Sequence, residues 1–209
     1  MLTLHKVLQK SLKHNTLCLL MSNYFLNFIF LPFIRYDKWL SLVVNAQVTT
    51  QNSSHFYFAY GSNMNQERMQ GRDIRSIDVF PGWIDGYGLR FNKRSVKDEH
   101  LGCANIIFAP QERVQGLLYQ LETALEINKL DFFEGTPFRY SRELFNVQTQ
   151  RGLQAAWIYI ANPGVIDNQL MPATWYIEHL LAGHEFLTED YCAQIASTPC
   201  VSHSTDPWS

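Results

Sequence analysis

The sequence predicts one globular domain that combines paired β-strands with short helices. Three observations support this prediction. The chain has 209 residues, of which 46% are hydrophobic, enough for one domain with a sizeable core. Segments rich in aromatic and β-branched residues follow one another in pairs, separated by turn residues. Helix-capping residues precede segments in which apolar residues recur at helical spacing.

The domain is predicted to begin with a strand, a tight turn and a helix. Aromatic and apolar residues fill positions 56–60, which predicts a short buried strand, and Gly61-Ser62-Asn63 ends it. A helix is predicted over 64–69, with Asn63 or Asn65 as its N-cap. Such a unit aims several backbone N–H groups at one point, where a carboxylate or phosphate binds without a cationic side chain. A plain connection between strand and helix fits the same residues.

The middle of the chain predicts further strands and the turns between them. The strands are expected over 76–92, 102–109, 114–121, 138–148 and 153–160, with loops over 93–101 and 161–172. Pro81-Gly82 and Gly86 predict a bend or bulge in the first of these strands. Pro110-Gln111-Glu112 predicts the turn of a hairpin, and Gln150-Arg151-Gly152 predicts a second turn.

Capping residues define the remaining helices. Thr123 and Glu126 match a capping box and Gly135 matches a C-terminal cap, which predicts a helix over 124–134. Two later helices are predicted over 174–183 and 188–195, with Thr174 and Thr188 as caps. The domain is therefore expected over 55–196, followed by a disordered tail over 197–209.

Glu134 is the candidate catalytic residue. Its spacing from Ile127 and Leu130 puts it on the apolar face of its helix. A buried carboxylate at a helix C-terminus is disfavoured as an anion by desolvation and by the helix dipole, which is typical of proton-transfer groups. The alternative is a structural glutamate paired with a buried arginine or tyrosine, and Arg139 and Arg142 are the available arginines.

Residues 1–54 differ from the rest of the chain. No acidic residue precedes Asp37, three lysines occur early, and positions 17–34 are almost entirely apolar. Three interpretations remain: a signal or membrane anchor, a targeting peptide, or an upstream extension of the reading frame. Two asparagines within the apolar run are costly in a bilayer, so a membrane association is expected only if 17–34 is a real anchor.

Composition excludes several classes of partner and site. A formal charge of -2 and a pI near 6.4 give no electrostatic footprint for nucleic acid. The four cysteines include no C-x-x-C, so we expect reduced thiols in a cytoplasmic protein, without a zinc site. His179 and His184 are five residues apart around Gly183, a poor spacing for one metal ion. Cys103 is expected to be a half-buried strand residue rather than a nucleophile.

Two segments together closely resemble the gamma-glutamylcyclotransferase family. They are Phe56-Tyr-Phe-Ala-Tyr-Gly-Ser-Asn63 and Leu130-Asp-Phe-Phe-Glu134-Gly135. Further matches in family order are Gly102–Ile106, Val114–Tyr119, Tyr140-Ser-Arg142, the helix of Tyr176 and Leu187–Tyr191. The resemblance covers roughly residues 55–196 and leaves the first 54 residues unexplained.

The resemblance implies a fold, a reaction and a site. The fold is α+β: a small, mostly antiparallel β-barrel flanked by helices. In the reaction, the α-amino group of an L-γ-glutamyl compound attacks its own γ-carbonyl, which forms 5-oxoproline and releases an amine or amino acid without a cofactor or metal. Glu134 matches the family's acid/base. The predicted substrate-binding residues are Tyr57, Phe58, Ala59, Tyr60, Gly61, Ser62, Asn63, Tyr140, Tyr159 and Tyr176.

This reaction suits a single carboxyl group. The substrate amine must lose a proton and the departing nitrogen must gain one, and one acid/base can do both in turn. The alternative is a catalytically silent member that binds a small molecule in the same pocket. The sequence leaves open which γ-glutamyl compound is used and whether the domain forms a homodimer.

Overall fold

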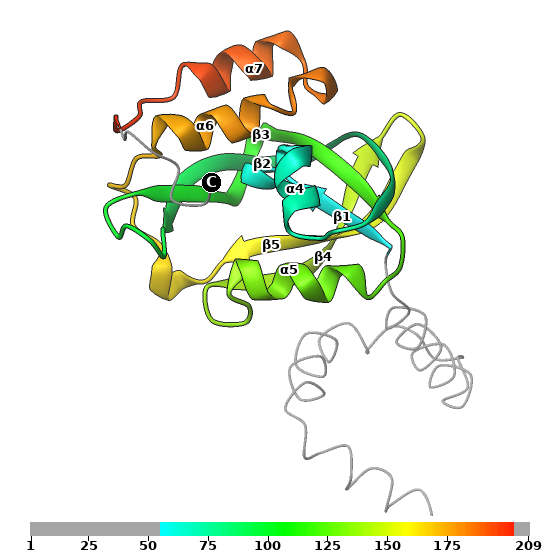
Figure 1. Ribbon diagram of the computed structural model, residues 1–209. Helices are drawn as coiled ribbons and strands as arrows, with labels where there is room; N and C mark the ends of the chain where they lie inside the picture. The colour runs from blue at the N-terminus through cyan, green and yellow to red at the C-terminus, as the bar shows by residue number, and fades with distance from the viewer. Residues whose placement is uncertain (1–54, 203–209) are drawn as a thin grey trace, which may run out of the picture. The chain divides into compact units, whose positions relative to one another are not determined.

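Five strands form a closed barrel in the computed structural model, which describes residues 55–202 (Figure 1). The strands are β1 (Phe56–Ala59), β2 (Ser76–Arg94), β3 (Gly102–Leu121), β4 (Tyr140–Thr149) and β5 (Gly152–Ala161). Their order around the barrel is β1, β3, β2, β4, β5. Neighbours are antiparallel except β1 and β5, whose parallel contact pairs Tyr57 with Trp157. The predicted α+β fold with a mostly antiparallel barrel is confirmed.

Short helices cover the outside of the barrel. They are α4 (Gln66–Gly71), α5 (Glu126–Glu134), α6 (Thr174–Leu181) and α7 (Glu189–Ala196), with 3-10 turns η2 (Ser62–Met64), η3 (Pro163–Val165) and η4 (His184–Phe186). Figure 1 shows α5 beside β4 and β5, whereas α6 and α7 lie beside β2 and β3. No helix among residues 55–202 has the length and apolar character needed to span a membrane. The predictions for residues 1–54, including the apolar run 17–34, lie outside the described residues.

The barrel closes tightly because two glycines make room for one aromatic ring. Phe58 of β1 has no exposed surface. A Cβ on Gly82 of β2 would lie 3.3 Å from the Phe58 ring, and a Cβ on Gly116 of β3 would lie 2.9 Å from it. Close packing of this kind excludes larger residues at both glycines. The neighbouring Ala59 is 1% exposed, so both residues belong to the core.

The hairpin predicted around Pro110 is wrong. β3 is one strand of 20 residues that pairs with β2 along most of its length. Asp85 pairs with Arg113 and Tyr87 pairs with Phe108, so residues 109–112 lie opposite the single residue Gly86. Gly86 has φ +80°, which favours glycine. The turn-forming residues therefore make a bulge, and the predicted bend at Gly86 is confirmed, while pairing at Pro81-Gly82 is regular.

Two of the predicted helix caps are confirmed. The Asn65 side chain accepts hydrogen bonds from the N–H groups of Glu67 and Arg68 at 2.9 and 3.3 Å, so Asn65 rather than Asn63 caps α4. Thr188 caps α7 by accepting from Tyr191 N–H at 3.4 Å. Residues with a polar side chain at the N-cap satisfy N–H groups that have no partner within the helix.

The observed ends of α5 and α6 agree with the predicted ends only in part. Gly135 has φ +67° and ends α5 as predicted. The capping box is wrong: α5 begins at Glu126, and the Glu126 carboxylate accepts instead from Arg75 N–H at 3.0 Å. The other error concerns Thr174, which is the first residue of α6 and makes no side-chain cap.

Part of the predicted disordered tail is folded against the domain. Val201 N–H donates to Pro172 O at 2.9 Å, and Thr174 N–H donates to Val201 O at 3.3 Å. Val201 also bridges Ala173 as a short parallel contact. The prediction of a disordered tail from residue 197 is therefore wrong for residues 197–202, and residues 203–209 lie outside the described part.

Candidate active site

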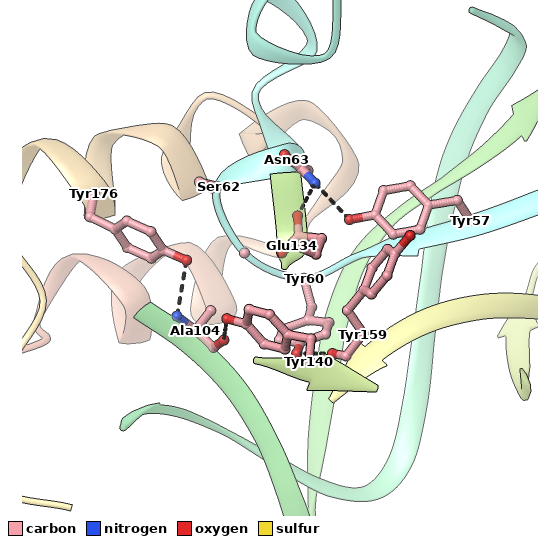
Figure 2. Close-up of a pocket in the computed structure, with 10 residues that line it drawn as sticks. Tyr57, Tyr60, Ser62, Asn63, Ala104, Glu134, Tyr140, Tyr159 and Tyr176 are labelled. Carbon is pink, nitrogen blue, oxygen red and sulfur yellow. Dashed lines mark hydrogen bonds between the residues drawn. The ribbon is translucent and has the colours of Figure 1, made fainter. Parts of the chain in front are cut away.

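A cavity forms where the turn after β1 meets the C-terminal end of α5 (Figure 2). The turn brings Gly61-Ser62-Asn63, and α5 brings Glu134. The residues that line the cavity are Tyr57, Tyr60, Gly61, Ser62, Asn63, Ala104, Glu134, Tyr140, Tyr159 and Tyr176. Two segments that are distant in the sequence thus build one site, and half of its lining residues are tyrosines.

Glu134 lies at the centre of this site (Figure 2). Ile127 and Leu130, which share its helix face, are 2% and 0% exposed, so α5 packs with this face inward. The Glu134 side chain is 17% exposed. Its Oε1 accepts a hydrogen bond from Asn63 Nδ2 at 3.1 Å. The carboxylate is therefore held at the turn by an amide that the turn itself provides.

Arg72 is the basic partner of Glu134. It follows α4, its side chain is 12% exposed, and its Nη1 lies 3.5 Å from Glu134 Oε1. The same Nη1 donates to Asn63 Oδ1 at 2.8 Å. The guanidinium also lies 4.6 Å from the centroid of the Phe133 ring. Arg72 and Asn63 together stabilise a negative charge on Glu134.

The two arginines that the sequence offered as partners of Glu134 contact other groups. Arg139 Nη2 donates to Arg94 O at 2.6 Å. Arg142 Nη1 donates to Asp131 Oδ2 at 2.8 Å. Sequence reasoning missed Arg72 because the pairing depends on the path of α4, which brings the chain back to α5 after the turn. No periodicity in the sequence marks that return.

Each tyrosine around the cavity has a defined hydrogen bond. Tyr57 OH accepts from Asn63 Nδ2 at 2.8 Å, and Tyr140 OH donates to Ala104 O at 2.7 Å. Tyr176 OH accepts from Ala104 N–H at 2.9 Å. Tyr60 OH donates to Tyr159 O, and Tyr159 OH donates to Asp131 Oδ1 at 2.8 Å. These bonds fix the rings as rigid walls.

The tyrosine hydroxyls are neutral at physiological pH. Burial raises the pKa of Tyr57, Tyr60, Tyr140 and Tyr176, and the nearby negative charge of Glu134 raises them further. Burial also raises the pKa of Tyr159, and its hydrogen bond to Asp131 adds to the effect. A neutral phenol donates or accepts hydrogen bonds without competing with Glu134 for a proton.

Gly61 allows three segments to approach one another at the cavity. A Cβ at this position would lie 2.9 Å from Ala104 Cβ and 3.2 Å from Tyr176 OH. The turn η2 that follows it closes with a hydrogen bond from Met64 N–H to Gly61 O at 2.9 Å. The first N–H groups of such a turn have no acceptor within it. Because Gly61 has no side chain, the turn can lie directly against Ala104 of β3 and Tyr176 of α6.

Most of the residues predicted for the site are brought together. The exceptions are Phe58 and Ala59, which lie in the core and do not line the cavity. Ala104 lines it without having been predicted, although it lies in the Gly102–Ile106 segment that the sequence marked. Strand alternation explains why Phe58 does not line the cavity, because Tyr57 and Phe58 point to opposite sides of β1.

The remaining residues that the sequence singled out are His179, His184 and Cys103. Asn65 Nδ2 lies 3.0 Å from His179 Nδ1, and His184 Nδ1 lies 3.1 Å from Leu181 O. Within residues 55–202 no group of three potential metal ligands was found. Cys103 is largely buried in β3, and burial raises the pKa of its thiol, which disfavours the nucleophilic thiolate.

Three solved structures have a similar fold. One is a gamma-glutamyl cyclotransferase, with 21% identity, a TM-score of 0.61, and coverage of 72% of this chain and 91% of that one. The human protein LOC79017 gives 23% identity, a TM-score of 0.62, and coverage of 72% and 91%. A yeast gamma-glutamyl cyclotransferase specific to glutathione gives 13% identity, a TM-score of 0.51, and coverage of 69% and 94%. At these identities the likeness shows the fold alone.

The sequence comparisons identify the family. A search of curated proteins gave no match. The family model described as gamma-glutamyl cyclotransferase, AIG2-like, matches residues 57–178. The match covers more than half of the chain and includes both the turn after β1 and Glu134. The chain therefore belongs to the AIG2-like gamma-glutamyl cyclotransferase family.

Proposed function

We propose that this protein cyclises an L-γ-glutamyl compound to 5-oxoproline and releases an amine or amino acid. The observation that supports this most strongly is the Glu134 carboxylate, held in the cavity by Asn63 at 3.1 Å and faced by the turn after β1. Membership of the gamma-glutamyl cyclotransferase family supports a small γ-glutamyl substrate. A substrate screen distinguishes γ-glutamyl dipeptides, amines and isopeptides as substrates.

Glu134 acts as the proton shuttle in this proposal. The carboxylate takes a proton from the substrate's α-ammonium group, and the resulting amine attacks the γ-carbonyl carbon. A new C–N bond closes the five-membered ring, and the bond from the γ-carbon to the leaving nitrogen breaks. Glu134 returns its proton to that nitrogen, then takes the second proton from the new ring nitrogen and passes it to the released amine, so no external reagent is consumed. A positioned acid/base of this kind contributes about 10² to 10⁴ in rate.

Arg72 and Asn63 orient the carboxylate for this shuttle. Asn63 Nδ2 binds both Glu134 Oε1 at 3.1 Å and Tyr57 OH at 2.8 Å. Arg72 Nη1 donates to the side-chain Oδ1 of Asn63 at 2.8 Å, which fixes the direction of the amide. A carboxylate held in one position needs little rearrangement when the substrate arrives, and this lowers the entropic cost of the reaction.

The turn after β1 serves the γ-glutamyl end of the substrate. Backbone N–H groups at the start of η2 bind the α-carboxylate or the γ-carbonyl oxygen, on which negative charge develops in the transition state. The five buried tyrosines exclude water and supply neutral hydrogen-bonding groups. Together they fold the substrate so that its amine meets its own carbonyl.

The proposed reaction takes place in the cytoplasm. The three described cysteines Cys103, Cys192 and Cys200 are free, as expected for a reducing compartment. The proposed chemistry uses only side-chain and backbone groups of the site.

A substrate screen tests the proposed function. The purified protein is incubated with γ-glutamyl dipeptides, a γ-glutamyl amine and γ-glutamyl-ε-lysine, and 5-oxoproline is measured by mass spectrometry. Formation of 5-oxoproline from at least one compound supports the enzyme. Binding of these compounds without product would favour the second candidate, a silent member that keeps the cavity but does not turn over.

A further inference from the structure

A buried lysine lies beside the active-site cavity, and no carboxylate in residues 55–202 forms an ion pair with it. Lys93, near the end of β2, is 5% exposed. Its Nζ lies 4.8 Å from the centroid of the Tyr140 ring, and Tyr140 lines the cavity. None of the ion pairs within residues 55–202 includes Lys93. A charged lysine is rarely buried unless it is paired.

A second cation lies against the same strand. Arg139 Nη2 donates at 2.6 Å to the carbonyl oxygen of Arg94, the residue after Lys93. Among the described residues, no hydrogen-bond partner reaches the buried Arg139 Nε. Burial lowers the pKa of Lys93, Cys103 opposes this shift, the charge of Arg139 lowers the pKa further, and the negative charge of Glu134 raises it. The buried Lys93 and the partly exposed Arg139 thus repel one another, and neither forms an ion pair with a described carboxylate.

A second buried group without a hydrogen-bond partner in residues 55–202 lies in the turn that precedes Arg139. Thr136 Oγ1 is buried, and no group in residues 55–202 hydrogen-bonds to it. The turn that carries Thr136 starts at Gly135, directly after Glu134, and Arg139 N–H closes it on Gly135 O at 2.9 Å. Buried polar groups are nearly always hydrogen-bonded, so two such groups in one turn, Thr136 Oγ1 and Arg139 Nε, indicate a ligand that satisfies them.

We propose that Lys93 and Arg139 form a subsite that binds a carboxylate of the substrate beside Tyr140. This inference rests on the proposed function. A carboxylate has two oxygen acceptors, which suit an ammonium, a guanidinium N–H and a hydroxyl, and its charge offsets both cations. A γ-glutamyl amino acid offers two sources: the α-carboxylate of its glutamyl half and the carboxylate of its leaving group.

Three matched substrates distinguish the sources. γ-Glutamyl-alanine carries both carboxylates. γ-Glutamyl-ethylamine lacks only the carboxylate of the leaving group. 4-Aminobutyryl-alanine lacks only the α-carboxylate, and its cyclisation gives 2-pyrrolidinone in place of 5-oxoproline. The kcat/KM for each compound is measured with the wild-type protein and with Lys93→Met and Arg139→Met. Lys97→Met, at an exposed lysine four residues along, is the control.

We expect Lys93→Met to fold, because methionine replaces a buried charge with an apolar chain of similar length. Its kcat/KM for γ-glutamyl-alanine should fall about tenfold or more, mainly through KM, because a charge-assisted contact is lost. Unchanged activity on γ-glutamyl-ethylamine assigns the subsite to the leaving group. Unchanged activity on 4-aminobutyryl-alanine assigns it to the α-carboxylate. Either result supports the subsite, and Arg139→Met should show the same pattern.

Two results would overturn the subsite. One is that both variants melt like the wild type and match Lys97→Met on all three compounds. The other is an equal loss on all three, which indicates a structural role. If the wild type converts none of them, the proposed function fails separately. Calorimetric binding of γ-glutamyl-alanine then decides the subsite: weaker binding by Lys93→Met supports it, and equal or absent binding contradicts it.

Discussion

Arg72 Nη1 and Glu134 Oε1 lie 3.5 Å apart at the inner end of α5. The two residues are 62 positions apart in the sequence, and α4 brings them together after the turn that carries Asn63. The same guanidinium nitrogen donates to the side-chain Oδ1 of Asn63 at 2.8 Å. One arginine therefore fixes both the carboxylate and the amide that holds it.

Replacing Arg72 tests this arrangement. We expect Arg72→Met to lower kcat/KM for the best γ-glutamyl substrate about tenfold or more, because Glu134 loses a charged partner and Asn63 loses its orientation. Arg72→Lys should retain part of the activity, since lysine keeps the charge but not the planar geometry of the guanidinium. Steady-state kinetics with the three proteins measure both effects.

A matched arginine far from the site provides the control. Arg151 Nη1 lies 2.8 Å from Asp78 Oδ2, and its guanidinium lies 4.5 Å from the centroid of the Phe80 ring. Arg151→Met removes the same kinds of contact from the barrel surface and should leave kcat/KM unchanged. Equal activities for Arg72→Met and Arg151→Met would contradict the role given to Arg72.

The packing of Gly61 makes a second prediction. A methyl group there would lie 2.9 Å from Ala104 Cβ, so Gly61→Ala should displace the turn from β3 and lower both kcat/KM and the melting temperature. Gly71→Ala is the matched control, because nothing lies within 4 Å of a Cβ at that position in α4. It should leave activity unchanged and stabilise the fold by about 0.5 to 1 kcal/mol. Thermal unfolding and kinetics of both variants decide the point.

The buried tyrosines predict a loss of stability at alkaline pH. Burial raises the pKa of Tyr60 and Tyr176 above that of an exposed tyrosine. The folded protein therefore keeps protons that the unfolded chain releases above about pH 10. The contribution of each group to stability is complete below that pH and is lost as the pH rises toward the folded-state pKa, by about 1.4 kcal/mol per pH unit.

Denaturant unfolding at a series of pH values measures this loss. Tyr176→Phe removes one titrating group, so its free energy of unfolding should fall less steeply than that of the wild type above about pH 10. Parallel curves for the two proteins in this range would show that Tyr176 ionises as easily in the folded state as in the unfolded chain.

Much of the fold follows from local patterns in the sequence. Strands, the αL cap at Gly135 and the Asn65 and Thr188 caps depend on residues close together in the chain, and each was predictable. The hairpin at Pro110 was not, because the same turn-forming residues suit a bulge when a glycine lies opposite them. Gly86 supplies that glycine from another strand.

The candidate site was also predictable only in part from local patterns. Helical spacing places Glu134 on the inner face of α5, and the turn residues Gly61, Ser62 and Asn63 follow directly from the end of β1. The partner of Glu134 depends on tertiary structure, so the sequence pointed to Arg139 and Arg142 instead of Arg72. Glu126 shows the same limit: its local pattern indicates a capping box, but a distant arginine, Arg75, provides the better partner.

The most direct test of the central claim compares 5-oxoproline formation by the wild type, Glu134→Gln and Glu185→Gln. Glu185 is an exposed glutamate in η4 and serves as the control. The amide of Glu134→Gln keeps the shape of the side chain but cannot shuttle a proton, so this variant should melt like the wild type and lose about 10² to 10⁴ in kcat. Glu185→Gln should remain fully active. A folded Glu134→Gln variant that forms 5-oxoproline at the wild-type rate would contradict the account.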